Sequence, residues 1–290
     1  MNSTLQAITV LVAFLGGGAL VFVFGSSYYS LFWTNKSWSF KLALVAASAV
    51  ATWLLSRSNL NPAYSLLAFG FLGASTANVV GAAASHLLHR PLNLSRDDVR
   101  AMGLAKGIEA VAVVGSILAL SVVFDVSLPG LYLTTGDLPL GLAIGCGGFA
   151  LFAVAAWIQG RQLKICAKTY RRLLPSIVLF VVANGLMEEL WFRGLYLGPL
   201  RSLVGPIAAI VLTAAVFALS HIGATYMQKQ ERVRFVIILF PLGLAWGACF
   251  HFTGSIIAAV LFHAGADLIA INGFIAAFHG RDSAIESVTS

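Results

Sequence analysis

The amino-acid sequence predicts an all-α fold: a polytopic transmembrane helical bundle of about 8–9 spans. The chain has 290 residues, of which 59% are hydrophobic and 10% are charged, and its mean hydropathy is +0.90. Soluble domains average roughly 45–50% apolar and about 25% charged residues. A chain this apolar cannot cover a soluble surface, and disorder requires the opposite composition. Long unbroken apolar runs favour helices over a β-barrel, whose strands would alternate.

Nine apolar runs have about the length of 20 residues that a spanning helix needs. The connections between them are short, so the sequence leaves no room for a separate soluble domain. The runs cover residues 5–25, 39–56, 63–88, 108–125, 138–158, 173–200, 205–225, 233–252 and 254–278.

The positive charges alternate between the two sides of this predicted bundle. Of the 18 Lys and Arg residues, 15 lie after the first, third, fifth, seventh or ninth run. Positively charged connections stay in the cytoplasm, so we expect the N-terminus outside and the C-terminus inside. This rule also explains the net charge of +7 without nucleic acid as a partner. The three cysteines form no CxxC pair and no disulfide framework.

Ionisable residues inside the predicted spans gather in the C-terminal part of the chain. A charge near the bilayer centre costs about 2.5–3.5 kcal/mol on insertion scales, so such residues indicate a function. They are Glu188, Glu189 and Arg193 in the sixth run, His221 in the seventh, and His263 and Asp267 in the ninth.

Helical spacing predicts partners within this group. Glu189 and Arg193 are four residues apart, share a helix face and are expected to form a structural ion pair. Glu188 is rotated by about 100° from Glu189, which leaves it for another task. In the alternative, both carboxylates serve Arg193 in a packing network. His263 and Asp267 are also four apart, so the Asp can orient the imidazole and fix its tautomer.

Depth in the bilayer predicts that Glu188, His221, His263 and Asp267 meet. Counted at about 1.5 Å per residue from the outer turns, all four lie at similar depth. A Glu there can act as a general base, a His can share in activating water, and a second His can bond an oxyanion. The same groups could instead bind zinc, and the residues alone do not decide between these alternatives. The usual HExxH signature of helical zinc proteases is absent.

Three motifs, each in its own apolar run, resemble the CPBP family. This family comprises type II CAAX prenyl endopeptidases and bacteriocin-processing or abortive-infection membrane proteins. The motifs are Glu-Glu-x-x-x-Arg at 188–193, Phe-x-x-x-His at 217–221 and His-x-x-x-Asp at 263–267. The resemblance covers roughly 173–278. We therefore expect N-terminal helices of unassigned role over 1–170, a catalytic transmembrane core over 171–280 and a short cytoplasmic tail over 281–290.

The resemblance implies intramembrane proteolysis of the glutamate type. Glu188 and His221 would activate water, and His263 would stabilise the oxyanion. Asp267 fits the Asn or Asp that family members carry at the end of the third motif. Family names refer to metalloproteases, but we expect no obligatory metal; zinc, if present, would take Glu188, His221 and His263. The expected partners are a membrane-associated protein or peptide and the lipid bilayer. The family core is usually drawn with eight spans, one fewer than the runs counted here.

Two other functions stay open. A proton-coupled transporter could use an acid and His chain as a relay, although the sequence has neither the internal repeat nor the broken helices of such carriers. A non-catalytic immunity or scaffold protein could share the fold without turnover. The intact Glu188, His221 and His263 argue against the scaffold, because it has no need to bury uncompensated ionisable groups.

Overall fold

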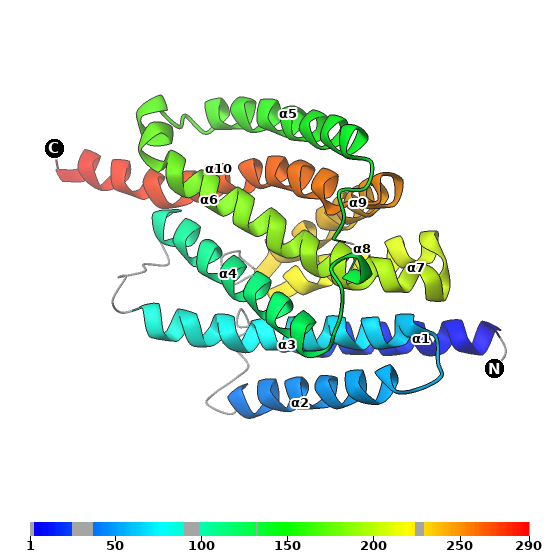
Figure 1. Ribbon diagram of the computed structural model, residues 1–290. Helices are drawn as coiled ribbons and strands as arrows, with labels where there is room; N and C mark the ends of the chain where they lie inside the picture. Colours follow the sequence, from blue (N-terminus) through cyan, green and yellow to red (C-terminus); the bar gives the residue numbers. More distant parts are fainter. Residues whose placement is uncertain (1–2, 25–36, 90–98, 132, 224–228, 290) are drawn as a thin grey trace.

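The fold is a bundle of long helices, in agreement with the predicted fold class. The computed structural model describes residues 3–24, 37–89, 99–131, 133–223 and 229–289, and these residues are almost entirely helical and contain no strand. Figure 1 shows the helices side by side, with the two ends of the chain at opposite ends of the bundle. Eight helices of the described ranges are long and apolar enough to cross a membrane. The protein is therefore an integral, multi-pass membrane protein.

The elements follow one another along the chain with few long connections. They are α1 (Ser3–Gly18), the π-helical η1 (Ala19–Phe24), α2 (Ser37–Ser56), α3 (Pro62–His89), α4 (Val99–Val123), the short η3 (Pro129–Leu131), α5 (Leu138–Gln162), α6 (Ala167–Glu189), the π-helical η4 (Leu190–Leu197), α7 (Gly198–Val204), α8 (Pro206–Ser220), the 3-10 turn η5 (His221–Gly223), α9 (Lys229–Thr253) and α10 (Ile256–Thr289).

The prediction of a full span over 205–225 is wrong. Helix α8 has 15 residues, a length of about 22 Å, which is short of a typical span. It ends at Ser220, where two side chains bond the carbonyl of Phe217. Ser220 Oγ donates to this oxygen at 2.6 Å, and His221 Nδ1 donates to it at 2.9 Å. The helix end therefore places His221 in a turn rather than inside a span.

Several helices extend beyond their predicted ends, and α4 and α10 do so by the most residues. Helix α4 begins at Val99, ahead of the predicted residue 108. An ion pair between Lys106 and Glu109, with 2.9 Å between Nζ and Oε2, neutralises charges in this added part. Helix α10 continues to Thr289, through the residues expected to form a tail.

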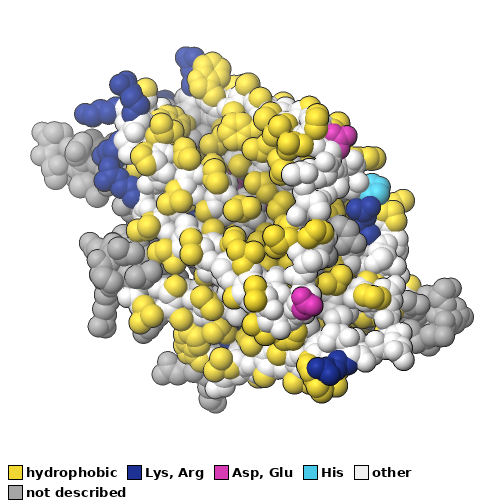
Figure 2. Space-filling model, in the orientation of Figure 1, with side chains coloured by type: hydrophobic (Ala, Val, Ile, Leu, Met, Phe, Trp, Pro, Cys, Tyr) yellow, Lys and Arg dark blue, Asp and Glu magenta, His cyan; other side chains and the backbone are white. Residues whose placement is uncertain are grey.

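The outer surface suits a lipid environment. Large apolar side chains such as Val111, Val122 and Ile207 are mostly exposed. In Figure 2, hydrophobic side chains are spread over the whole visible face, and Lys and Arg lie towards its margins. Inside the bundle, α6 packs against both α4 and α10, and α10 also contacts α5 and α9. This packing places α6 and α10 together at the centre.

Gly103 marks a close approach of α4 to α6. A Cβ atom at Gly103 would lie 2.5 Å from the carbonyl oxygen of Ser176, whereas one at Gly115 of the same helix would meet nothing within 4 Å. We expect Gly103→Ala to lower the midpoint of thermal unfolding in detergent by several degrees, because overpacking costs about 1–3 kcal/mol. Gly115→Ala serves as the matched control and should leave the midpoint unchanged or slightly higher. Equal midpoints for the two variants would contradict the close contact.

Candidate active site

Glu188, His221, His263 and Asp267 lie together at the meeting point of α6, η5 and α10. Oε1 of Glu188 is 3.7 Å from Nε2 of His221, and Oε2 is 3.6 Å from Nε2 of His263. Nε2 of His263 is also 3.7 Å from Oδ1 of Asp267. Each separation exceeds a direct hydrogen bond but allows one water molecule to contact both groups. The cluster thus joins two carboxylates and two imidazoles from three elements.

The cluster is largely shielded from its surroundings. The Glu188 residue is 8% exposed, His263 and Asp267 are buried, and His221 is half-buried. Oε2 of Glu188 is buried and has no hydrogen-bond partner among the described residues. Buried polar atoms are normally paired, so this oxygen marks a position where a ligand or a water would bind.

Glu189 links Arg193 to His263. Arg193 Nη1 donates to Oε1 of Glu189 at 3.1 Å, as the i,i+4 spacing predicts, and both side chains are 0% exposed. His263 Nδ1 donates to the same oxygen at 2.7 Å. The acceptor of the hydrogen bond that orients His263 is therefore Glu189 and not, as expected, Asp267. The Asp267 oxygen lies too far away for such a bond.

Both imidazoles present the same nitrogen to Glu188. Nδ1 of His221 donates to the carbonyl of Phe217, and Nδ1 of His263 donates to Glu189. Because each acceptor requires a proton on Nδ1, the tautomer of each neutral ring is fixed. Nε2 of each ring is left to face Glu188.

The helix type changes directly after Glu189. The segment η4 (Leu190–Leu197) is π-helical, and π segments often occur at functional sites. Arg193 lies in η4, where its Nη2 donates to the carbonyl of Gly243 on α9 at 2.8 Å. Its guanidinium carbon lies 5.6 Å from the ring centroid of Trp246, also on α9. Arg193 thus ties η4 to α9 beside the cluster.

Two further contacts of the site were not expected from the sequence. The ring of Trp246 stacks on His263, with 3.9 Å between centroids and 8° between planes. Asn184 Nδ2 donates to Oδ2 of Asp267 at 3.0 Å. Nothing in the sequence marks Trp246 as a site residue, because it is one aromatic residue in an apolar helix. The sequence does mark Asn184, because it is a polar residue four positions before Glu188, on the same helix face.

The described residues contain no group of three or more His, Cys, Asp or Glu side chains that could hold a metal ion. The zinc alternative would need Glu188, His221 and His263 to converge on one point. Instead, the two oxygens of Glu188 face different imidazoles. The side chains of Glu188, His221 and His263 therefore do not fit a zinc ligand set.

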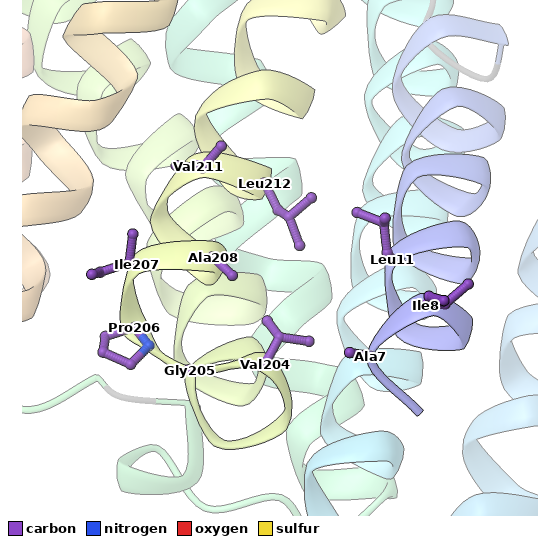
Figure 3. A pocket seen from close by; sticks show the side chains of 10 residues that line it. All are labelled: Ala7, Ile8, Leu11, Val204, Gly205, Pro206, Ile207, Ala208, Val211 and Leu212. Carbon is purple, nitrogen blue, oxygen red and sulfur yellow. The ribbon is translucent and has the colours of Figure 1, made fainter. Parts of the chain in front are cut away.

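An apolar groove of about 690 Å³ lies elsewhere in the bundle. It is lined by residues of α1 and by residues from the end of α7 to the middle of α8 (Figure 3). Its lining on α8 ends at Leu212, about 13 Å along the chain direction from His221. All side chains that line it are apolar, so it offers no groups for chemistry.

A comparison with protein families gives a match for the region around the cluster. Neither the curated proteins nor the solved structures include a match to this chain. The four clustered side chains all lie within residues 170–269. That region matches the family model of the type II CAAX prenyl endopeptidase Rce1-like proteins, which confirms the resemblance of this part of the chain to a family of membrane proteases.

Proposed function

We propose that the protein is an intramembrane endopeptidase that hydrolyses a peptide bond of a membrane-associated protein or peptide through water activated by Glu188. The observation that carries this proposal is the position of the Glu188 carboxylate, whose two oxygens lie 3.6 and 3.7 Å from Nε2 of two imidazoles. A carboxylate and an imidazole around one water are the groups that general-base hydrolysis requires.

The geometry supports a different catalytic role for each of Glu188, His221 and His263. Glu188 takes a proton from water while Nε2 of His221 holds that water, and the resulting hydroxide attacks the peptide carbonyl. Nε2 of His263, when the ring is protonated, donates a hydrogen bond to the oxyanion. Glu188 then passes its proton to the leaving amine, so the carbon–nitrogen bond breaks and the carboxylate is regenerated. Glu189 and Trp246 hold the His263 ring in place during these steps.

The position of the cluster supports a proposal for the substrate class. The groups are enclosed by spanning helices, so the peptide reaches them from the membrane or its inner surface. We propose that the protein processes the C-terminus or a terminal tag of a membrane-anchored chain.

A peptide library tests this proposal. Purified wild type and Glu188→Gln in detergent are incubated with membrane-anchored C-terminal peptides, and cleavage is read by mass spectrometry. Cleavage by the wild type alone supports the proposal. No cleavage by either folded protein contradicts it and favours the scaffold or immunity alternative. Counter-ion-dependent transport in liposomes would favour the transporter.

Metal chelation gives a separate prediction. We expect incubation with a zinc chelator to change the rate of peptide cleavage by less than about twofold, because Glu188 is placed to activate water as a base without a Lewis acid. The check is the cleavage rate with chelator, without it, and after zinc is added back. A loss of cleavage that zinc restores would contradict this mechanism.

A further inference from the structure

Asn184 is a buried polar residue that the mechanism above does not use. It lies on α6, one turn before Glu188 on the same helix face, and is only 7% exposed. Its Nδ2 donates to Oδ2 of Asp267 at 3.0 Å. The neighbouring Gly185 lets α6 approach α10 closely. A Cβ atom at Gly185 would lie only 3.2 Å from the carbonyl oxygen of Val260 on α10. Asn184 therefore belongs to the wall of the catalytic cluster.

The bond to Asp267 fixes which way the Asn184 side chain faces. An ionised carboxylate only accepts hydrogen bonds, so the amide NH₂ group must face it. The opposite orientation would bring two acceptor oxygens together. Oδ1 of Asn184 is thus directed away from the Asp267 carboxylate.

Oδ1 of Asn184 is itself buried and has no hydrogen-bond partner in the described part of the chain. Oε2 of Glu188 shares both properties, one helical turn further on. A buried acceptor without a donor costs free energy, so each such oxygen needs an explanation. In the proposed mechanism the Glu188 carboxylate binds the water to be activated. The same face of α6 therefore carries a second buried acceptor, one turn from Glu188.

We propose that Oδ1 of Asn184 binds the substrate by accepting a hydrogen bond from a backbone N–H group next to the peptide bond that is hydrolysed. This inference rests on the proposed function. An extended peptide directs successive N–H groups to alternate sides, so an N–H group next to the scissile bond can face α6. A main-chain contact of this kind holds a peptide regardless of its side chains. It also aligns the scissile carbonyl with the water on Glu188.

A backbone substitution in the substrate tests the contact. A peptide that the wild type cleaves is made with an ester in place of the amide at each position flanking the scissile bond. At one position the ester is expected to lower kcat/KM of the wild type at least about tenfold. In Asn184→Ala the same ester should change kcat/KM less than about twofold, while esters elsewhere affect both enzymes equally.

This comparison separates binding from a purely structural role. If Asn184 only positioned Asp267, its loss would lower kcat for every peptide alike and would leave the ester penalties unchanged, which would overturn the inference. Asn184→Ser repeats the measurement with a smaller perturbation if Asn184→Ala does not fold.

Peptide binding provides a readout that does not depend on cleavage. Fluorescent versions of the anchored peptides and their esters are titrated onto Glu188→Gln and onto Glu188→Gln with Asn184→Ala. An ester penalty on binding that disappears with Asn184→Ala supports the inference even if the wild type cleaves nothing and the proposed function fails. Equal penalties in both proteins overturn the inference alone. No binding and no cleavage of any peptide would overturn both proposals.

Discussion

Replacing Glu188 by Gln is expected to lower kcat for peptide cleavage by about 10³-fold or more. Gln has the shape of Glu and can bond the same neighbours, but it cannot take a proton from water. General-base catalysis contributes about 10²–10⁴-fold, and here the same carboxylate also delivers the proton to the leaving amine. Initial rates measured by mass spectrometry, together with thermal unfolding of both proteins, provide the check. The unfolding midpoint should change little.

Asp125→Asn is the matched control for this substitution. Asp125 is exposed in the turn after α4 and has a φ of 52°, a conformation that Asn adopts readily. The variant removes one carboxylate charge outside the cluster and should keep the full rate of cleavage. A Glu188→Gln protein that cleaves as fast as Asp125→Asn would exclude Glu188 as the base.

Much of the cluster could be predicted because polar residues are conspicuous in apolar spans. Glu188, His221 and His263 stand out in runs that are otherwise largely apolar, and counting about 1.5 Å per residue sets their depth. Depth alone predicted that they would meet. The i,i+4 contact between Glu189 and Arg193 follows from the same regular geometry.

The remaining contacts depend on how the helices are rotated against one another, which spacing along a single helix does not specify. Glu189 bonds His263 across 74 positions of sequence separation. Trp246 is one aromatic residue in an apolar run, and its stack on His263 depends on the packing of α9 against α10. Helix α8 likewise ends at Ser220, five residues before the end of its apolar run. Hydropathy averaged over a window cannot detect such an end.

Replacing Arg193 by Met is expected to be the most destabilising of the substitutions considered. Met fills a similar volume but leaves the fully buried Glu189 without its cation, and breaking a buried ion pair in this way costs about 3–5 kcal/mol. The variant also loses the bond from Nη2 to the carbonyl of Gly243. We expect the midpoint of thermal unfolding in detergent to fall by about 10 °C or more.

A second variant tests whether the unpaired charge of Glu189 causes the loss of stability in Arg193→Met. Arg193→Met combined with Glu189→Gln removes both charges and keeps an oxygen that can accept from Nδ1 of His263. If the unpaired Glu189 carboxylate accounts for most of the lost stability, the double variant will unfold at a higher temperature than Arg193→Met alone. Arg57→Met, at an exposed position after α2, should cost less than about 1 kcal/mol. Equal midpoints for the single and double variants would mean that Arg193 stabilises the bundle through its contacts with α9, and that Glu189 is held chiefly by His263.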